Sequence, residues 1–312
     1  MNWLEITIET APSTIQTVAN RLTAGGFEDL VIEDQTEFEE FLEENRSCWD
    51  YIDEALQKEL EGLSRIKLYL EDTDTASMER LKKLLEKLGL TMQINKMAET
   101  NWEESWKDNY PPQEVGESLV VLPYWLQDME THRKKIILDP GLTFGTGAHP
   151  STQMVMQTME ETNLKDAVCL DLGSGSGILS ITALRLGAKS AAGVDIDPKA
   201  EGIARENAAY NGFGAPEFLA FTGNVTADKQ LMEKLADRHY DLVLVNIVAD
   251  VIIGLSPVLP KFMDEKTLLI CSGILDTRLA DVKEALEKAG LTVTKTKAKE
   301  DWRCVSAKRR NL

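Results

Sequence analysis

The chain has 312 residues and 43 % hydrophobic content, which is enough for one large or two medium domains with buried cores. It contains no apolar run near the roughly 20 residues of a membrane helix and no basic, apolar leader, so we expect a cytoplasmic protein without a membrane partner. The formal net charge of −18 disfavours a nucleic-acid substrate and favours a basic partner, although acidity also serves solubility alone.

The first region, residues 1–97, predicts a small α+β domain of ferredoxin-like order. Strand patterns at 3–8, 30–32, 65–70 and 91–94 alternate with helical patterns that follow Ser13 and that end at Gly89. The order is strand, helix, strand, strand, helix, strand. Residues 28–44 hold nine acids and no base, and a helix is expected at 49–60, so an acidic insertion follows the second strand.

The second region, residues 98–141, is interpreted as a linker with a small β element. Residues 101–110 predict a short amphipathic helix that carries Trp102 and Trp106 and stops at Pro111. Two apolar runs, residues 119–122 and 135–138, predict strands.

The third region, residues 142–312, predicts an α/β catalytic domain. Strands are expected at 167–172, 190–195, 217–222, 241–247, 267–272, 291–296 and 302–307, with helices between most of them. The short connection between the last two strands predicts a terminal antiparallel hairpin, as in the Rossmann-like sheet of methyltransferases. Cys169 and Cys271 fall within strands and are expected as buried thiols, and no Cys-x-x-Cys pair predicts a metal site.

A glycine-rich turn joins the first of these strands to its helix. Its glycines are Gly173, Gly175 and Gly177, and such residues let the backbone approach a ligand closely at the carboxyl end of a strand. A dinucleotide fingerprint needs a further glycine at the position of Ile178. Because S-adenosylmethionine has no phosphate to seat at the helix N-terminus, the spacing favours a methyltransferase over a dehydrogenase.

Two polar residues end the neighbouring strands. Asp195 lies about 20 residues beyond the glycines, where an acid accepts hydrogen bonds from ribose hydroxyls, and Asp197 is expected to cap the helix that begins at Pro198. Asn246 ends a later strand. Its amide oxygen is suited to accept an amine hydrogen and to aim the nitrogen lone pair at a methyl carbon. A capping or turn role remains open for both Asp195 and Asn246.

A loop rich in Gly, Thr and Pro precedes the sheet at residues 139–152. Ser151 or Thr152 is expected to begin the next helix. Composition alone would make this loop a linker.

Four motifs in this order resemble the PrmA family, which methylates protein eleven of the large ribosomal subunit. They are Thr143-Phe144-Gly145-Thr146-Gly147 with His149-Pro150, Asp171-Leu172-Gly173-x-Gly175-Ser176-Gly177, Asp195-Ile196-Asp197-Pro198, and Asn246-Ile247. The resemblance covers residues 139–273 closely and the N-terminal region only in architecture. Ser151-Thr152 and Val248 are mild departures from the family pattern.

The resemblance implies a class I protein-lysine N-methyltransferase that uses S-adenosylmethionine and modifies lysine and N-terminal amines. It implies cofactor contacts at Thr152, Gly173, Asp195 and Asn246. Gly175 and Gly177, in the same loop as Gly173, are expected to bind the cofactor as well. The loop from Phe144 to Thr146 is expected to close over the cofactor and the target amine. The N-terminal domain is expected to hold the ribosomal protein, and the enzyme is expected to act as a monomer.

Alternatives stay open at this stage. An RNA methyltransferase, or one acting on another protein, would use the same cofactor chemistry, but an RNA enzyme calls for a basic face. A dehydrogenase is opposed by Ile178. His149 is interpreted either as a base that removes the amine proton or as a structural loop residue.

Overall fold

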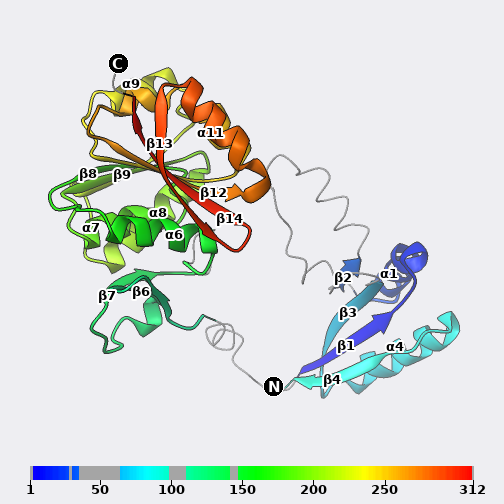
Figure 1. The fold of residues 1–312 in the computed structure, drawn as a ribbon. Helices are drawn as coiled ribbons and strands as arrows, with labels where there is room; N and C mark the ends of the chain where they lie inside the picture. The colour runs from blue at the N-terminus through cyan, green and yellow to red at the C-terminus, as the bar shows by residue number, and fades with distance from the viewer. Residues whose placement is uncertain (1–2, 28–29, 35–63, 98–109, 141–146, 311–312) are drawn as a thin grey trace. The chain divides into compact units, whose positions relative to one another are not determined.

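A computed structural model gives the fold of the chain and describes residues 3–27, 30–34, 64–97, 110–140 and 147–310 (Figure 1). The chain divides into two compact units, Met1–Asn109 and Tyr110–Leu312. Each unit has a hydrophobic core of its own. Within these described residues, no helix has the length and hydrophobicity that spanning a membrane requires.

The first unit is an antiparallel sheet with two helices on one face. Its strands occur in the order β2-β3-β1-β4, with bounds β1 Trp3–Glu9, β2 Leu30–Asp34, β3 Ser64–Glu71 and β4 Gln93–Met97. The helices α1 (Ile15–Ala24) and α4 (Thr75–Leu88) pack against the alternate strand residues that include Ile6 and Ile66. Alternating burial of this kind is what a sheet covered on one face requires, and it confirms the ferredoxin-like arrangement.

Several predictions for the N-terminal region fall outside the described residues. These are the acidic stretch apart from residues 30–34, the helix at 49–60, and most of the helix at 101–110. The strand predictions are confirmed, with ends that differ from the predicted ones by up to three residues.

A three-stranded sheet opens the second unit. Its order is β5-β6-β7 (Gln113–Val115, Leu119–Pro123, Lys134–Leu138), and β6 and β7 are parallel. The side chains of Val121 and Ile136 belong to the same core cluster as Val155 and Leu179 of the larger sheet's helices. The small sheet is therefore packed into the core of the second unit.

The larger sheet has seven strands in the order β10-β9-β8-β11-β12-β14-β13. Their bounds are β8 Val168–Leu172, β9 Ser190–Asp195, β10 Phe218–Thr222, β11 Leu242–Asn246, β12 Leu268–Leu275, β13 Leu291–Lys299 and β14 Trp302–Arg309. Neighbours from β10 to β12 are parallel, whereas β14 runs antiparallel to both β12 and β13. The predicted terminal hairpin is confirmed.

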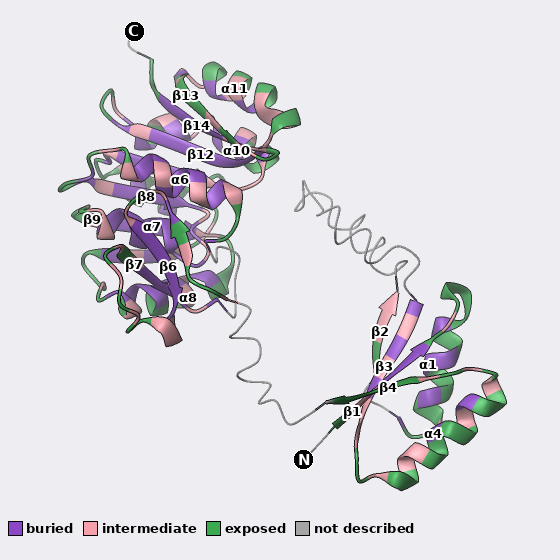
Figure 2. Cartoon of the chain, turned by 60° about the horizontal axis from the view of Figure 1, so that its bottom comes forward, coloured by how far each residue is buried: buried purple, intermediate pink, exposed green. Residues whose placement is uncertain are grey.

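Helices cover both faces of this sheet (Figure 1). They are α6 Pro150–Glu160, α7 Ile178–Arg185, α8 Pro198–Tyr210, α9 Lys229–Ala236, α10 Ala249–Leu255 and α11 Leu279–Lys288. Leu242 and Leu244 of β11 join one core cluster, and Val243 and Val245 join the other. The central strands are apolar on both sides and buried, as Figure 2 shows, because parallel strands lie between two layers of helices.

Two buried asparagines, one in α8 and one at its C-terminal cap, attach β7 to the larger sheet. The side chain of Asn211 forms the two hydrogen bonds that a neighbouring strand would form with Ile137. Its Nδ2 donates to Ile137 O at 2.7 Å, and its Oδ1 accepts from Ile137 N at 2.9 Å. Asn207 Oδ1 accepts from Asp139 N at 2.8 Å, and its Nδ2 donates to Ser176 O at 2.9 Å. Asn207 therefore ties the end of β7 directly to the glycine turn.

Replacing Asn211 tests this attachment. We expect Asn211→Ala to lower the free energy of unfolding by about 1–3 kcal/mol, because it leaves both polar groups of Ile137 without their partner. Urea denaturation of the full chain measures the change. As the control, Asn163→Ala removes an exposed turn contact to Lys165 N and should cost less than about 0.5 kcal/mol. Equal effects from the two variants would contradict the prediction.

Candidate active site

Five of the predicted site residues lie where β8, β9 and β11 end: Gly173, Gly175, Gly177, Asp195 and Asn246. These strands are neighbours and run parallel, so the turns after Leu172, Asp195 and Asn246 lie along one edge of the sheet. Ligands of open α/β sheets bind at this edge. The fold therefore brings three of the four sequence motifs to the place where a ligand is expected.

The glycine turn adopts a conformation that side chains rarely allow. Gly173, Gly175 and Gly177 have φ angles of +79°, +48° and +79°. A Cβ on Gly173 would overlap the Cγ2 atom of Ile247, and one on Gly177 would lie 3.1 Å from the Cβ of Ala204. These two glycines are therefore needed for the turn to pack against β11 and α8.

Asp195 holds the turn through its carboxylate. Oδ2 accepts from Gly175 N at 2.8 Å, and Oδ1 accepts from Asp197 N at 3.0 Å. The side chain is only half-buried, so each oxygen keeps a further lone pair toward the edge of the sheet. Asp197 caps α8, as predicted, by accepting from Lys199 N at 2.9 Å.

Asn246 and Thr152 lie 94 positions apart in sequence and meet in the fold. Asn246 Nδ2 donates to Thr152 Oγ1 at 3.1 Å. This contact turns the other end of the amide away, and Asn246 Oδ1 is buried without a hydrogen-bond partner among the described residues. A buried acceptor without a partner is costly, and it is commonly retained where a ligand supplies the missing donor.

Ile247 fixes the position of Asn246 from the next residue along. Its side chain fills the space left by the missing Cβ of Gly173, and its carbonyl oxygen lies against Gly273, where a Cβ would overlap it. Ile247 N also donates to Ser272 O of β12 at 3.2 Å. The residues after β11 are thus held between β8 and β12.

Asp171 is a buried acid that the sequence placed in a motif without indicating its role. Its Oδ2 accepts from Ser180 N at 3.1 Å and from Ser180 Oγ at 2.8 Å, whereas Oδ1 has no partner among the described residues. Burial raises the pKa of Asp171 to about 7, and the bonds from Ser180 act in the opposite direction. The signal available in the sequence was a charged residue at the end of an apolar strand.

The loop before α6 was predicted only in part. The helix begins at Pro150, and its N-cap is His149, whose Nδ1 accepts from Ser151 N at 3.2 Å. Ser151 and Thr152 therefore lie inside the helix instead of starting it, because the imidazole nitrogen does the capping. Phe144 and Thr146 lie outside the described residues, so their predicted closing role stays a prediction.

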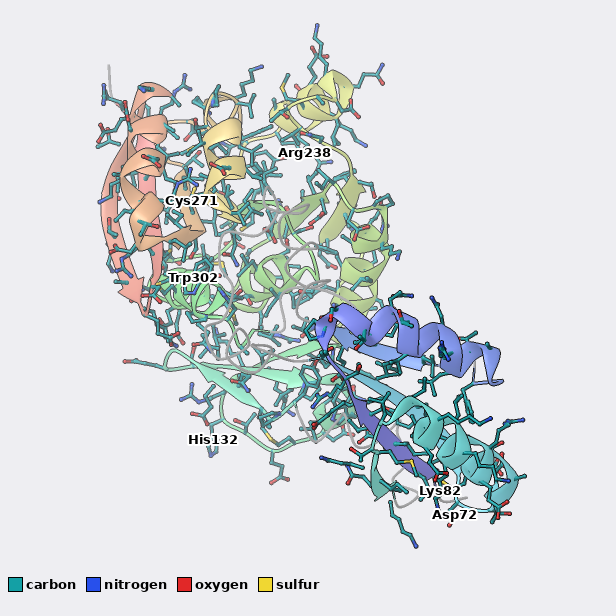
Figure 3. The ribbon with its side chains drawn as sticks, turned by 90° about the vertical axis from the view of Figure 1, so that its right-hand side faces the viewer. Asp72, Lys82, His132, Arg238, Cys271 and Trp302 are labelled. Atoms are coloured by element: carbon teal, nitrogen blue, oxygen red, sulfur yellow. The ribbon has the colours of Figure 1, made fainter. Side chains whose placement is uncertain are left out.

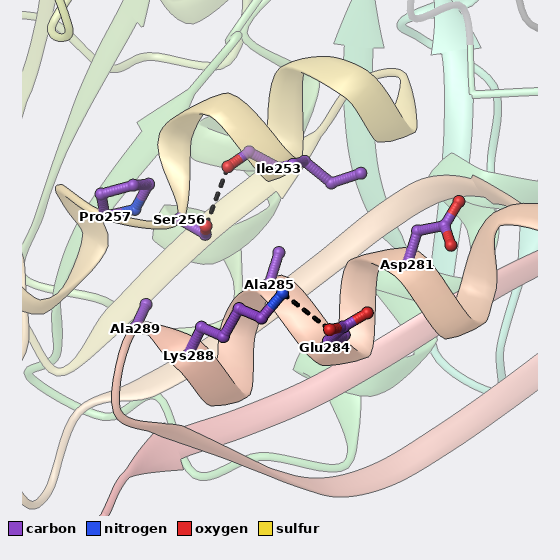
Figure 4. Close-up of a pocket in the computed structure, with 8 residues that line it drawn as sticks. All are labelled: Ile253, Ser256, Pro257, Asp281, Glu284, Ala285, Lys288 and Ala289. Carbon is purple, nitrogen blue, oxygen red and sulfur yellow. Dashed lines mark hydrogen bonds and ion pairs between the residues drawn. The ribbon is translucent and has the colours of Figure 1, made fainter.

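A shallow hollow of about 440 Å³ lies between α10 and α11 (Figure 4). Its lining includes Ser256, Pro257 and Ala289, which follow the carboxyl ends of these helices. Since both helices start at the edge where β11 and β12 end, those carboxyl ends lie toward the opposite edge of the sheet. Lys288, in the lining of the hollow, forms an ion pair with Glu284 at 2.6 Å. The hollow is therefore separate from the candidate site.

Known proteins of one family resemble this chain. A model of the ribosomal protein L11 methyltransferase family (PrmA) matches residues 2–310. A ribosomal protein L11 methyltransferase of Alkaliphilus oremlandii is 34 % identical over 99 % of both chains, and one of Alkaliphilus metalliredigens is 35 % identical over 99 % of this chain and 98 % of its own. The crystal structure of a ribosomal protein L11 methylase from Lactobacillus delbrueckii subsp. bulgaricus has a TM-score of 0.58 and 31 % identity, covering 65 % of this chain and 100 % of that one.

The contact between Ile247 and Gly273 provides a first test of the site. Gly273 has a φ of +82°, and a Cβ there would overlap Ile247 O. We expect Gly273→Ala to lower the free energy of unfolding by about 1–3 kcal/mol. Gly202 lies in α8 with open space around it, so Gly202→Ala should be neutral or stabilising by up to about 1 kcal/mol. Denaturant titration of both variants decides, and a loss shared by both would refute the prediction.

The pKa of Asp171 gives a second test. The folded value of about 7 lies above the unfolded value of about 3.9, so the folded chain binds this proton more tightly. Its contribution to stability is present below about pH 4 and is lost as the pH rises through about 7. In Asp171→Asn, an amide oxygen can still accept from Ser180 but carries no charge, so this fall should disappear from unfolding measured between pH 4 and 8.

A second variant at the same position separates charge from packing. Asp171→Ala also loses the two bonds from Ser180 and should be less stable than Asp171→Asn at every pH. If the stability of wild type and Asp171→Asn ran parallel across the range, the raised pKa of Asp171 would be wrong.

Proposed function

This chain belongs to the ribosomal protein L11 methyltransferase (PrmA) family, and from that premise we propose that it transfers methyl groups from S-adenosylmethionine to lysine and N-terminal amines of ribosomal protein L11. The observation that carries the proposal is the buried Oδ1 atom of Asn246, an acceptor without a partner among the described residues at the carboxyl edge of a methyltransferase sheet. We propose that the cofactor-binding residues are Thr152, Gly173, Gly175, Gly177 and Asp195. Asn246 is both cofactor-binding and catalytic.

The residues at this edge fit S-adenosylmethionine. Asp195 offers the remaining lone pairs of its carboxylate to the two ribose hydroxyls, and Ile196 beside it exposes 72 % of its surface, so it can cover one face of an adenine. The positive φ angles of the glycine turn bring backbone close to the amino-acid part. The cofactor is a cation at its sulfur and at its ammonium group, and the carboxylate of Asp195 lies against the turn, where it accepts from Gly175 N.

The chemistry requires alignment more than activation. When bound, S-adenosylmethionine would supply a methyl group whose bond to sulfur breaks as the nitrogen lone pair forms the new bond. Asn246 Oδ1 accepts a hydrogen of the neutral amine and so points the lone pair toward the methyl carbon. Thr152 Oγ1 keeps the amide in that orientation.

The amine must lose a proton before it reacts. A free lysine has a pKa of about 10.4, so only a small fraction is neutral at pH 7. We assign this proton to water, because the described side chain that faces the amine site is a neutral amide. Each transfer then converts a neutral amine into a methylated ammonium, which loses a proton before a further methyl is added.

The recognition of the protein substrate is assigned to residues 1–97, with residues 98–141 as linker and small β element and 142–312 as the catalytic domain. The net charge of −18 favours a basic ribosomal protein over RNA. One chain carries every residue assigned to the site, which supports action as a monomer, and a ribosomal substrate supports a cytoplasmic location.

A labelling experiment tests the proposed function. Purified chain is incubated with S-adenosylmethionine carrying a labelled methyl group and with ribosomal protein L11, and the product is mapped by mass spectrometry. Label on lysine and N-terminal nitrogens is expected. Label in RNA with none in L11 would replace the proposal with the RNA alternative, and no binding of S-adenosylhomocysteine in calorimetry would remove the cofactor assignment.

Two substitutions separate binding from transfer. Asp195→Ala should raise the Kd of S-adenosylhomocysteine by about 10- to 100-fold, because hydrogen bonds to a charged group are lost. Asn246→Ala should instead lower kcat by about 100-fold, because the amine is no longer aligned, with a smaller change in that Kd. Calorimetry and initial rates measure these effects, and Asn163→Ala, in an exposed turn before β8, is the matched control. A wild-type rate for Asn246→Ala would disprove the alignment argument.

A further inference from the structure

We propose that His149 is a positioning residue for methyl transfer: its Nδ1 atom caps α6 and thereby holds Thr152 against Asn246, and its ring does not serve as the base that deprotonates the substrate amine. The inference rests on the proposed function only for its effect on the rate. The state of the ring follows from the geometry alone.

The tautomer of His149 is set by Ser151. The backbone N–H of Ser151 can act only as a donor. Ser151 N lies 3.2 Å from His149 Nδ1 and donates to it, so Nδ1 must carry a lone pair. Ser151 Oγ lies 2.7 Å from the same atom, and beside that N–H it shares the single lone pair of Nδ1 as a second donor. The neutral ring therefore carries its proton on Nε2. An atom that already bears a proton cannot take another from an amine.

A ring contact with Trp302 orients the imidazole of His149. Trp302, the first residue of β14, meets His149 edge to face with ring centroids 4.5 Å apart and an interplanar angle of 72°. Trp302 is labelled in Figure 3. Since β14 is antiparallel to β12, it begins at the edge where the parallel strands end. The hairpin thus contributes a side chain at the site edge.

The same hairpin holds α6 at further points. Lys295 and Lys297 of β13 each donate to Glu161 at 2.7 Å. Lys299 donates to Gln153 Oε1, one turn beyond His149. Contacts at both ends of α6 leave the helix little freedom to shift against the sheet.

Partial burial favours the neutral form of the ring at pH 7. Partial burial against Trp302 lowers the pKa of His149, and the carboxylate of Glu300 in the hairpin turn acts in the opposite direction. Lys299 on the same hairpin is bound to the neutral side chain of Gln153. The groups on α6 itself that face the ring, Ser151 and Pro150, carry no charge.

The cap matters for the reaction because it fixes the first turn of α6, which carries Thr152. This threonine is the third residue of the helix, and its Oγ1 accepts from Asn246 Nδ2 at 3.1 Å. A shift of the first turn would break that bond and let the amide of Asn246 rotate. Small displacements of an aligning group cost large factors in rate.

Nuclear magnetic resonance of the full chain tests the ring directly. The chain has three histidines, so a long-range ¹H–¹⁵N correlation of labelled protein, assigned with variants at His132, His149 and His239, resolves each ring. We expect His149 to be neutral at pH 7 with its proton on Nε2. A proton on Nδ1, or a charged ring at pH 7, overturns the proposal without any measurement of methyl transfer.

Two isosteric variants test the effect on the rate. In His149→Asn, the amide oxygen takes the place of Nδ1 and can still accept from Ser151 N, whereas in His149→Gln the polar end takes the place of Nε2 and the cap is lost. We expect His149→Asn to keep kcat within a few fold and the wild-type pH profile. His149→Gln should lose about tenfold or more in kcat, with little change in KM for L11.

The opposite pattern identifies a base. If His149→Asn lost activity and flattened the pH profile while His149→Gln kept both, proton transfer at Nε2 would be the correct role and the proposal would fail. Failure of the wild-type chain to methylate L11 would instead reject the proposed function, and the resonance measurement would still report on the ring. Circular dichroism of both variants establishes that they fold.

Discussion

The close approach of Ile247 to two glycines is the constraint on which the site depends. Gly173 directly follows β8 and Gly273 lies in β12, and each would overlap Ile247 if it carried a Cβ. Because Asn246 directly precedes Ile247, the backbone position of its amide is set by both neighbouring strands. The hydrogen bond to Thr152 then fixes the rotation of the amide, which leaves Oδ1 as a buried acceptor. The rigid backbone and the hydrogen bond to Thr152 together fix the direction of Asn246 Oδ1.

Charge in the site is arranged so that binding and reaction use different groups. In the proposed function, the carboxylate of Asp195 lies at the glycine turn, where a cationic cofactor gains from negative charge. In the proposed function, Asn246 aligns the reacting amine and His149 holds Thr152 against Asn246. The first is an amide, and partial burial lowers the pKa of the second, which favours its neutral form. A site divided in this way attracts the methyl donor without also stabilising a protonated amine.

The sequence was most informative where local pattern and topology coincide. Apolar strands such as 242–246 and the turn at Gly173 to Gly177 were predicted at nearly the observed bounds, because parallel strands and strand-to-helix turns have strong local signals. The roles of Asn207, Asn211 and Gly273 were not predicted. Each acts on a partner at least 26 positions away, and nothing near it in sequence marks the contact. His149 was seen as a loop residue or a base, because the capping use of Nδ1 depends on ring orientation.

In the proposed function, the choice of an amide at position 246 follows from the acid–base chemistry of the substrate. A carboxylate there would attract the ammonium form of lysine, raise the pKa of the amine, and hold the form that has no lone pair. An amide oxygen accepts a hydrogen from either form but gains far less from the positive charge, so it opposes the loss of the proton much less than a carboxylate would. The desolvated surroundings of Oδ1 act in the same direction, because burial of an amine disfavours its charged form. In the proposed function, burial of the site therefore increases the reactive fraction of the amine, and the oriented acceptor aligns it.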